Sequence, residues 1–95
     1  MILARVKGTM VTARRAQKAQ GARYLIVTPC TLDGKEAGPA FVALDTMGSG
    51  PGEVVLVSRG SSARQTEETK DRPVDAVIIG IVDLVEEKGK LVFKK

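Results

Sequence analysis

The segment from Asp45 to Arg64, DTMGSGPGEVVLVSRGSSAR, constrains the fold most, because a glycine-rich loop, an apolar strand and a serine-bearing turn follow one another directly. Gly48, Gly50 and Gly52 can adopt positive φ or lie against another backbone, and a proline stiffens the loop between them. This composition favours a packed contact over a flexible linker. No Gly-Lys-Ser/Thr follows, and a strand rather than a helix comes next, so the loop is neither a phosphate cradle nor a dinucleotide fingerprint.

Short apolar runs separated by turn residues make up most of the remaining sequence. The pattern predicts strands at residues 2–13, 24–27, 41–44, 53–57 and 76–82. Gly8 is expected to bend or bulge the first strand, and Asp33-Gly34 to form the tight turn that reverses the second. Residues 91–93 follow a turn at Lys88-Gly89 and can pair with residues 76–82 as a terminal strand.

A short helix is expected between the fourth and fifth strands. Ser61 or Ser62 can cap it, and Ser62 with Gln65 has the capping-box spacing in which each side chain satisfies the other's backbone amide. Pro73 prevents continuation, so this helix should end near Thr69.

The composition fits a compact β-barrel. Only Tyr24, Phe41 and Phe93 are aromatic among 95 residues, so Val, Ile, Leu and Ala must build the core. Short strands leave open edges unless their sheet closes on itself. We therefore expect one mostly β domain over residues 1–95, a small closed OB-like β-barrel of five to six strands with one short helix.

Strand 53–57 stands out because its near-continuous valines indicate burial on both faces. Two-sided burial points to contact with another subunit. A chain of this length buries only about 60–65% of the surface that its unfolded form exposes, so we expect assembly to contribute to its stability.

The chain carries a formal charge of +4, from 15 basic and 11 acidic residues. These charges are interleaved, which is typical of a mixed, solvated surface. An OB-like module that binds single-stranded nucleic acid is the main alternative function, and it needs aromatic rings stacked along a basic groove. Phe41 and Phe93 lie in apolar runs, which leaves Tyr24 alone as a stacking platform. We therefore expect no nucleic-acid partner.

Cysteine content and hydropathy predict the cellular location. Cys30 is the only cysteine, so no intrachain disulfide can form, and the chain fits a reducing cytosol. The start, MILARVKGTM, lacks the charge order and apolar length of a secretory signal. The longest apolar run, AVIIGIV, is too short for a bilayer, which takes about 20 residues. We expect a soluble intracellular protein with no membrane partner.

The sequence contains no histidine, the commonest general base and metal ligand. Nothing in the sequence places a base beside Ser61 or Ser62, and helix capping accounts for both. Asp45, Asp75 and Asp83 lie at strand ends, but their spacing matches no metal-binding loop. We expect no enzymatic activity, no catalytic residue, no metal site and no cofactor.

Four blocks follow one another along the chain: ILARVKGTMVTAR, RYLIVTPCTLDGK, FVALDTMGSGPGEVVLVSRGSSAR and PVDAVIIGIVD. In this order they resemble the vertex proteins of bacterial microcompartment shells, the EutN/CcmL family, over almost the whole length. The main departures lie in the loop RRAQKAQG and the charged tail EEKGKLVFKK. They leave the fold untouched and affect partner-specific contacts.

The resemblance implies an OB-like barrel with a structural role, a pentamer that caps the vertices of a polyhedral bacterial microcompartment in the cytoplasm. Hexameric and trimeric shell proteins are the further partners it implies. Flat hexagonal tiles need five-fold units at the corners of a closed shell. A five-fold ring in turn needs a head-to-tail contact, in which two different surfaces of the subunit meet.

Small residues permit close approach of backbones, so we hypothesise that the glycine-rich loop and the turn after the fourth strand form the subunit interface. The candidate residues are Gly48, Ser49, Gly50, Pro51, Gly52, Gly60, Ser61, Ser62 and Arg64. Arg64 can bond a neighbour's carboxylate or carbonyl, although a free surface arginine fits the sequence equally well. Gly50→Asp is expected to alter assembly without unfolding the barrel. The loop at 14–23 and the basic tail are secondary candidates for contacting hexamers.

Overall fold

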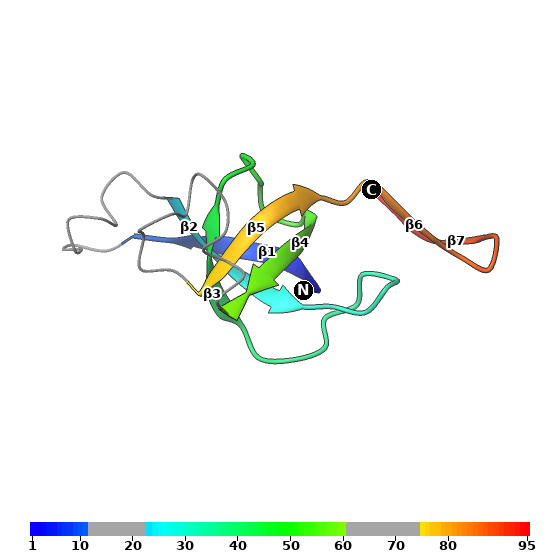
Figure 1. The fold of residues 1–95 in the computed structure, drawn as a ribbon, viewed down its shortest axis with the longest axis horizontal. Coiled ribbons are helices and arrows are strands. Elements are labelled where there is room, and N and C mark those ends of the chain that lie inside the picture. Colours follow the sequence, from blue (N-terminus) through cyan, green and yellow to red (C-terminus); the bar gives the residue numbers. More distant parts are fainter. Residues whose placement is uncertain (12–22, 61–74) are drawn as a thin grey trace.

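A computed structural model of the chain describes residues 1–11, 23–60 and 75–95, which form seven β-strands (Figure 1). The strands are β1 (Ile2–Met10), β2 (Arg23–Pro29), β3 (Phe41–Asp45), β4 (Val54–Arg59), β5 (Ala76–Ile81), β6 (Leu84–Glu87) and β7 (Lys90–Lys94). The first five coincide with the five main strands expected from the sequence. Within these described ranges, no helix is long and apolar enough to cross a membrane.

Strands β1 to β5 close into a barrel in the order β1-β2-β3-β5-β4. β4 closes it by pairing antiparallel with β1, so that Ile2 lies opposite Val57. Neighbouring strands are antiparallel except β3 and β5, which run parallel. The β1 register shifts between Val6 and Gly8, at the bulge expected there. The expected mostly β fold, a closed OB-like barrel, is confirmed.

The interior of the barrel is aliphatic. In β1 the buried Ala4 and Val6 alternate with Arg5 and Lys7, as a strand with one face on the core requires. The buried core comprises Ala4, Val6, Leu25, Val27, Ala43, Val55, Val57, Ala76 and Ile78. Small and branched side chains thus fill the space that aromatic rings occupy in many larger cores.

β4 is buried on both faces within a single protomer. Val55 and Val57 belong to the core, while Val54, which alternates with them, is only 2% exposed. No neighbouring subunit is needed to cover these valines. The two-sided burial of the valine run is therefore explained within one chain and is not evidence for the subunit contact inferred from the sequence.

Strands β6 and β7 form a separate two-stranded sheet that stands away from the barrel (Figure 1). Residues 91–93 pair with β6, so the prediction that they pair with the strand at 76–82 is wrong. The physical reason is that β5 already pairs with β3 on one edge and β4 on the other. A closed barrel leaves no free edge for a terminal strand, and the chain leaves it at Val82, whose amide donates to the Val54 carbonyl at 2.8 Å.

The tight turn expected at Asp33-Gly34 is present. Gly34 has a φ of +88°, and its amide donates to the Thr31 carbonyl at 2.9 Å. On either side of this turn, Cys30 and Glu36 form a single isolated β-bridge and not a longer hairpin. The expected helix, from Ser62 to about Thr69, lies outside the described residues.

Candidate subunit-contact site

The glycine-rich loop between β3 and β4 uses glycine where the backbone requires it. Gly48 and Gly52 have φ values of +76° and +86°, which side-chain-bearing residues rarely adopt. Gly50 does not have positive φ. Its amide instead donates to Glu53 Oε1 at 2.5 Å, and its carbonyl accepts from the Glu53 amide at 3.2 Å.

Asp45, at the end of β3, anchors the loop from inside. Its carboxylate accepts hydrogen bonds from the Met47 amide, from the amide and hydroxyl of Ser49, and from the Arg23 guanidinium, all at 2.5–3.3 Å. The side chain is only 1% exposed. Burial alone raises the pKa of Asp45, but these hydrogen bonds and the arginine charge outweigh it and hold the pKa below its ordinary value. Asp45 is therefore an anionic anchor rather than a metal ligand or an acid.

The far side of the loop is fastened to β1. The Gly52 amide donates to the Val6 carbonyl at 2.8 Å, and the Val6 amide donates to the Glu53 carbonyl at 2.9 Å. Arg5 adds a third link, with Nη1 donating to the Gly52 carbonyl at 2.6 Å. The loop is thus a docked element of its own protomer, as expected for a packed contact.

Glu53 ties the loop to the end of the chain. Its Oε2 accepts a hydrogen bond from Lys95 Nζ at 2.6 Å, while Oε1 holds the Gly50 amide. The Lys95 bond first, and the Gly50 bond second, lower the pKa of Glu53 from its ordinary value. The same bond raises the pKa of Lys95. One carboxylate therefore fixes both the loop and the base of the β6–β7 hairpin.

The solvent-exposed part of the loop contains fewer residues than the segment proposed from the sequence. Ser49 is 1% exposed and its hydroxyl is bonded to Asp45, so its side chain serves the loop's own structure. Gly48, Pro51 and Gly52 are exposed, and Met47 beside them is 48% exposed. A neighbouring subunit would therefore meet backbone, the proline ring and a methionine.

The second predicted segment is described only at its first residue. Gly60 has a φ of +68°, and its amide donates to the Asp75 carbonyl at 2.7 Å. Gly60 thus forms a backbone turn at the end of β4. Ser61, Ser62 and Arg64 lie outside the described residues.

A junction around Arg5 escaped the sequence analysis. Besides its bond to Gly52, Arg5 donates from Nε and Nη2 to the Gly34 carbonyl at 3.1 and 2.8 Å, and its guanidinium lies 5.8 Å from the Phe93 ring centroid. One side chain therefore connects the glycine-rich loop, the turn after β2 and the hairpin. In the sequence Arg5 is simply an outward-facing residue of an alternating strand, and nothing there signals its three partners.

The aromatic side chains are engaged within the protein. Tyr24 is half-buried against Leu44 and Val77 on the outside of the barrel. Phe41 packs against the core with the Arg59 guanidinium 4.4 Å from its centroid, and Phe93 lies at the Arg5 junction. All three rings therefore have partners within the described part of the chain, whereas a nucleic-acid-binding barrel needs rings exposed as stacking platforms.

The remaining candidate residues gather into no site within the described ranges. There, no three His, Cys, Asp or Glu residues lie close enough to hold a metal ion. Asp75 and Asp83 accept bonds through their main-chain carbonyls, from Gly60 and Lys95. Cys30 is half-buried, and burial raises the pKa of its thiol, which disfavours the reactive thiolate.

Comparison with known proteins decides the family. The sequence profile described as "Ethanolamine utilisation protein EutN/carboxysome" matches residues 1–83. This chain belongs to the EutN/CcmL family. It is 41% identical to the carboxysome shell vertex protein CcmL of Synechococcus elongatus over 99 residues, covering 100% of this chain and 96% of the relative.

Solved structures in the EutN/CcmL family share the whole fold. CcmL of Nostoc sp. PCC 7120 superposes with a TM-score of 0.94 at 34% identity, covering 100% of both chains. GrpN of Rhodospirillum rubrum, described as a pentameric microcompartment shell protein, superposes with a TM-score of 0.82 at 40% identity, covering 92% of this chain and 99% of that one. The family profile covers the barrel strands, whereas the hairpin lies beyond residue 83 and within the part that superposes on CcmL of Nostoc.

Proposed function

We propose that this chain is a structural shell protein that forms pentamers and caps the vertices of a bacterial microcompartment in the cytoplasm. The observation that carries the proposal is the likeness, over 92% of the chain, to a pentameric microcompartment shell protein. Its role is mechanical: a five-fold unit introduces the curvature that flat six-fold tiles lack. No catalytic step is required of it.

The ring contact uses the glycine-rich loop as one of its two surfaces. The loop is held rigidly by Asp45, Arg5 and Glu53, so a neighbour can dock on it without an ordering cost. Its exposed part, Gly48 and Pro51 to Gly52, carries little side-chain bulk and lets another backbone approach closely. Gly60, at the end of β4, and Ser61, Ser62 and Arg64, which lie outside the described residues, are the other residues that we assign to the ring contact.

Hexameric and trimeric shell proteins are the partners on the outer side of the ring. A cap at a vertex must meet flat tiles along each of its five edges, so a second class of contact is needed beyond the ring contact. The basic tail, with Lys88, Lys90, Lys94 and Lys95, and the loop at 14–23 supply charged residues for it.

Native mass spectrometry tests the function directly, and a loop variant tests the site. The wild type should appear as five copies. Pro51→Glu places a carboxylate on the exposed loop and removes none of the described hydrogen bonds, so it should shift the distribution towards monomers. Gly50→Asp is a poorer choice, because a Cβ there would lie 3.5 Å from Glu53 Oε1 and the new carboxylate would be repelled by Glu53.

Val42→Glu is the matched control, because Val42 is 37% exposed on β3, outside the candidate interface. It adds the same charge to the barrel wall and should leave the pentamer intact. A monomeric wild type at all concentrations would overturn the proposed function. A pentameric Pro51→Glu variant would remove only the loop from the interface.

A further inference from the structure

The end of the glycine-rich loop is joined to the β6–β7 hairpin through side chains, since no described barrel strand pairs with the hairpin. The Gly52 carbonyl accepts a hydrogen bond from Arg5 Nη1 at 2.6 Å, and the same guanidinium lies 5.8 Å from the Phe93 ring centroid. One side chain on β1 thus lies between the hairpin and the exposed end of the loop.

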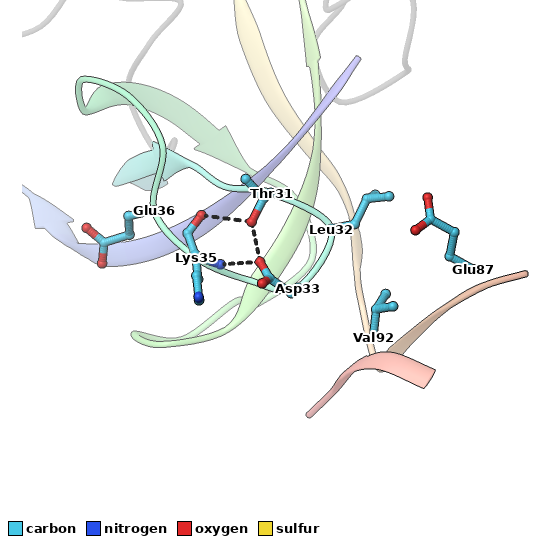
Figure 2. A pocket seen from close by; sticks show the side chains of 7 residues that line it. All are labelled: Thr31, Leu32, Asp33, Lys35, Glu36, Glu87 and Val92. Atoms are coloured by element: carbon cyan, nitrogen blue, oxygen red, sulfur yellow. Dashed lines mark hydrogen bonds between the residues drawn. The ribbon is translucent and has the colours of Figure 1, made fainter. Parts of the chain in front are cut away.

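The turn after β2 fixes the other side of this guanidinium. Arg5 Nε and Nη2 both donate to the Gly34 carbonyl, at 3.1 and 2.8 Å. Figure 2 shows that internal bonds hold the turn: the Thr31 hydroxyl donates to the Asp33 carboxylate and, at 3.4 Å, to the Lys35 carbonyl, and the Lys35 amide donates to Asp33 Oδ1 at 3.3 Å. The turn is therefore a fixed support from which the guanidinium reaches the loop and the hairpin.

Little space separates the turn, the guanidinium and the ring. A Cβ on Gly34 would lie 2.5 Å from Arg5 Nη2 and 2.9 Å from Phe93 Cδ1. Elsewhere a cleft open to solvent separates the turn from the hairpin, with Leu32 on one wall and Val92 on the other (Figure 2). Contact between the turn and the hairpin is therefore concentrated at Phe93.

The shape of the arginine side chain makes this contact a link. Its guanidinium is planar, and its donors point in fixed directions. With two donors on the Gly34 carbonyl, a tilt of the plane moves Nη1 relative to the Gly52 carbonyl. The Phe93 ring limits that tilt, so displacing the hairpin should loosen the bond to Gly52.

The other routes between the two elements are less suited to coupling. Lys95 Nζ bonds Glu53 Oε2, whereas Glu53 holds the loop through Oε1, so the loop bond does not need the lysine. The lysine is half-exposed, and exposed ion pairs contribute little. The main-chain bond from Val82 to Val54 is made before the hairpin begins. Arg5 is the remaining described link.

We propose that Arg5 is a positioning residue that couples the hairpin to the glycine-rich loop, so that a hairpin in place strengthens the ring contact of the loop. The effect on the ring rests on the function proposed above, whereas the coupling is a property of a single chain. Gly52 lies in the exposed part of the loop, so the bond from Arg5 orients a peptide group that a neighbour would meet. Coupling is reciprocal, and a neighbour docked on the loop should also hold the hairpin more firmly.

A cycle of two substitutions tests the coupling by amide exchange. Phe93→Leu removes the ring but keeps an apolar side chain, and Arg5→Lys keeps the charge but removes the planar fork. The reporter is the Gly52 amide, which donates to the Val6 carbonyl at 2.8 Å. Phe93→Leu should speed its exchange about fivefold or more in the wild-type background, but less than about twofold in the Arg5→Lys variant.

Lys7→Gln is the matched control for Arg5→Lys. Lys7 follows on the same strand and pairs with Glu36 of the same turn at 2.6 Å, but no described contact joins it to the loop or the hairpin. Phe93→Leu should keep its full effect on Gly52 exchange in this variant. Urea midpoints and the exchange of β4 amides, measured alongside, separate a local opening from a loss of global stability.

Sedimentation velocity of the same proteins tests the effect on the ring. Arg5→Lys and Phe93→Leu should each weaken self-association about fivefold or more, and the double variant should lose no more than the weaker of the two. Gly52 exchange that does not respond to Phe93→Leu, or that responds equally with and without Arg5, would overturn the coupling. Single variants that assemble normally, or losses that add, would overturn its role in the ring. A wild type that stays monomeric would overturn the proposed function, and the exchange cycle would still decide the coupling.

Discussion

The glycine-rich loop and the β6–β7 hairpin both leave the barrel, but they are held in opposite ways. The loop has a buried carboxylate inside it, two main-chain bonds to β1 and an arginine on its last turn. The hairpin has its own ladder and a few contacts at its base. The loop is fixed by bonds within its own chain, so its exposed surface is already ordered before any neighbour docks. The described contacts of the hairpin with the rest of the chain lie at its base.

This contrast separates two kinds of surface element. A preorganised loop loses little entropy when a partner docks. Substitutions that break its internal bonds should affect folding, whereas a substitution on its exposed side, such as Pro51→Glu, should affect only binding. A hairpin held at its base opens locally at a lower free-energy cost, so substitutions at that base should speed its amide exchange while leaving the barrel stable. Substitutions at Asp45, Gly34 and Lys95 test whether the loop and the hairpin differ in this way.

The largest effect is expected at Asp45. Asp45→Asn keeps the shape of the side chain but replaces an acceptor oxygen with an NH₂ donor that faces other donors, and it leaves Arg23 without its carboxylate. We expect the free energy of unfolding to fall by about 3 kcal/mol, because a buried charge-assisted network is broken. Urea denaturation monitored by circular dichroism measures this.

Asp83→Asn is the control for this change, since Asp83 is exposed and its described bond is made by its main-chain carbonyl. It should be nearly neutral. An Asp45→Asn variant as stable as the wild type would mean that the loop is not held from inside, and the contrast with the hairpin would lose its basis.

A smaller loss of stability is expected at Gly34, which contacts Arg5 and Phe93 where the loop and the hairpin meet. A Cβ on Gly34 would lie 2.5 Å from Arg5 Nη2 and 2.9 Å from Phe93 Cδ1, at a φ of +88°. Gly34→Ala therefore combines backbone strain with a clash at the hairpin base, and we expect a loss of about 2 kcal/mol. Its hairpin amides should also exchange faster.

Gly48→Ala separates the cost of backbone strain from the cost of the clash. Gly48 also has positive φ, but no atom lies within 4 Å of the added Cβ. It should cost only the backbone strain, about 1 kcal/mol, and leave hairpin exchange unchanged. Equal losses at Gly34 and Gly48 would show that the junction does not hold the hairpin.

The barrel and the loop were the parts that the sequence could predict. Alternating and continuous apolar runs located the five barrel strands. Of the glycines expected to allow positive φ, Gly34, Gly48 and Gly52 have it and Gly50 does not. The anchoring of the loop was not predictable, because Asp45 also fits an ordinary turn residue. Its bonds to Met47 and Ser49 are local, but its bond to Arg23 depends on how β2 and β3 are paired.

The hairpin was misassigned for a topological reason. Residues 91–93 read correctly as a strand, but local sequence does not reveal that closure of the barrel occupies both edges of β5. Leu84–Glu87 was missed as a strand because its two glutamates interrupt the apolar pattern. Arg5 shows the same limit, since three partners 29 to 88 residues away in sequence meet only in the folded chain.

The smallest change in stability is expected at Lys95, which follows β7. Lys95→Gln removes the ammonium from Glu53 but leaves Glu53 bonded to the Gly50 amide, so the loop should keep its structure while the hairpin base loosens. Because exposed ion pairs contribute little to stability, the urea midpoint should not move measurably. The ratio of variant to wild-type amide exchange rates in β7 should rise above one at neutral pH.

The pH dependence of that ratio identifies Glu53 as the partner. The pKa of Glu53 in the folded protein lies below its ordinary value of 4.5, so the ion pair contributes fully above pH 4.5 and its contribution is lost as the pH falls through the folded pKa. The ratio should therefore fall back towards one in acid, where the wild type has lost the same interaction. Glu53→Gln should show the same raised ratio at neutral pH and the same fall towards one in acid. A ratio that stays constant from neutral pH into acid would mean that Lys95 holds the hairpin through its main chain, by the amide bond to Asp83, rather than through its charge.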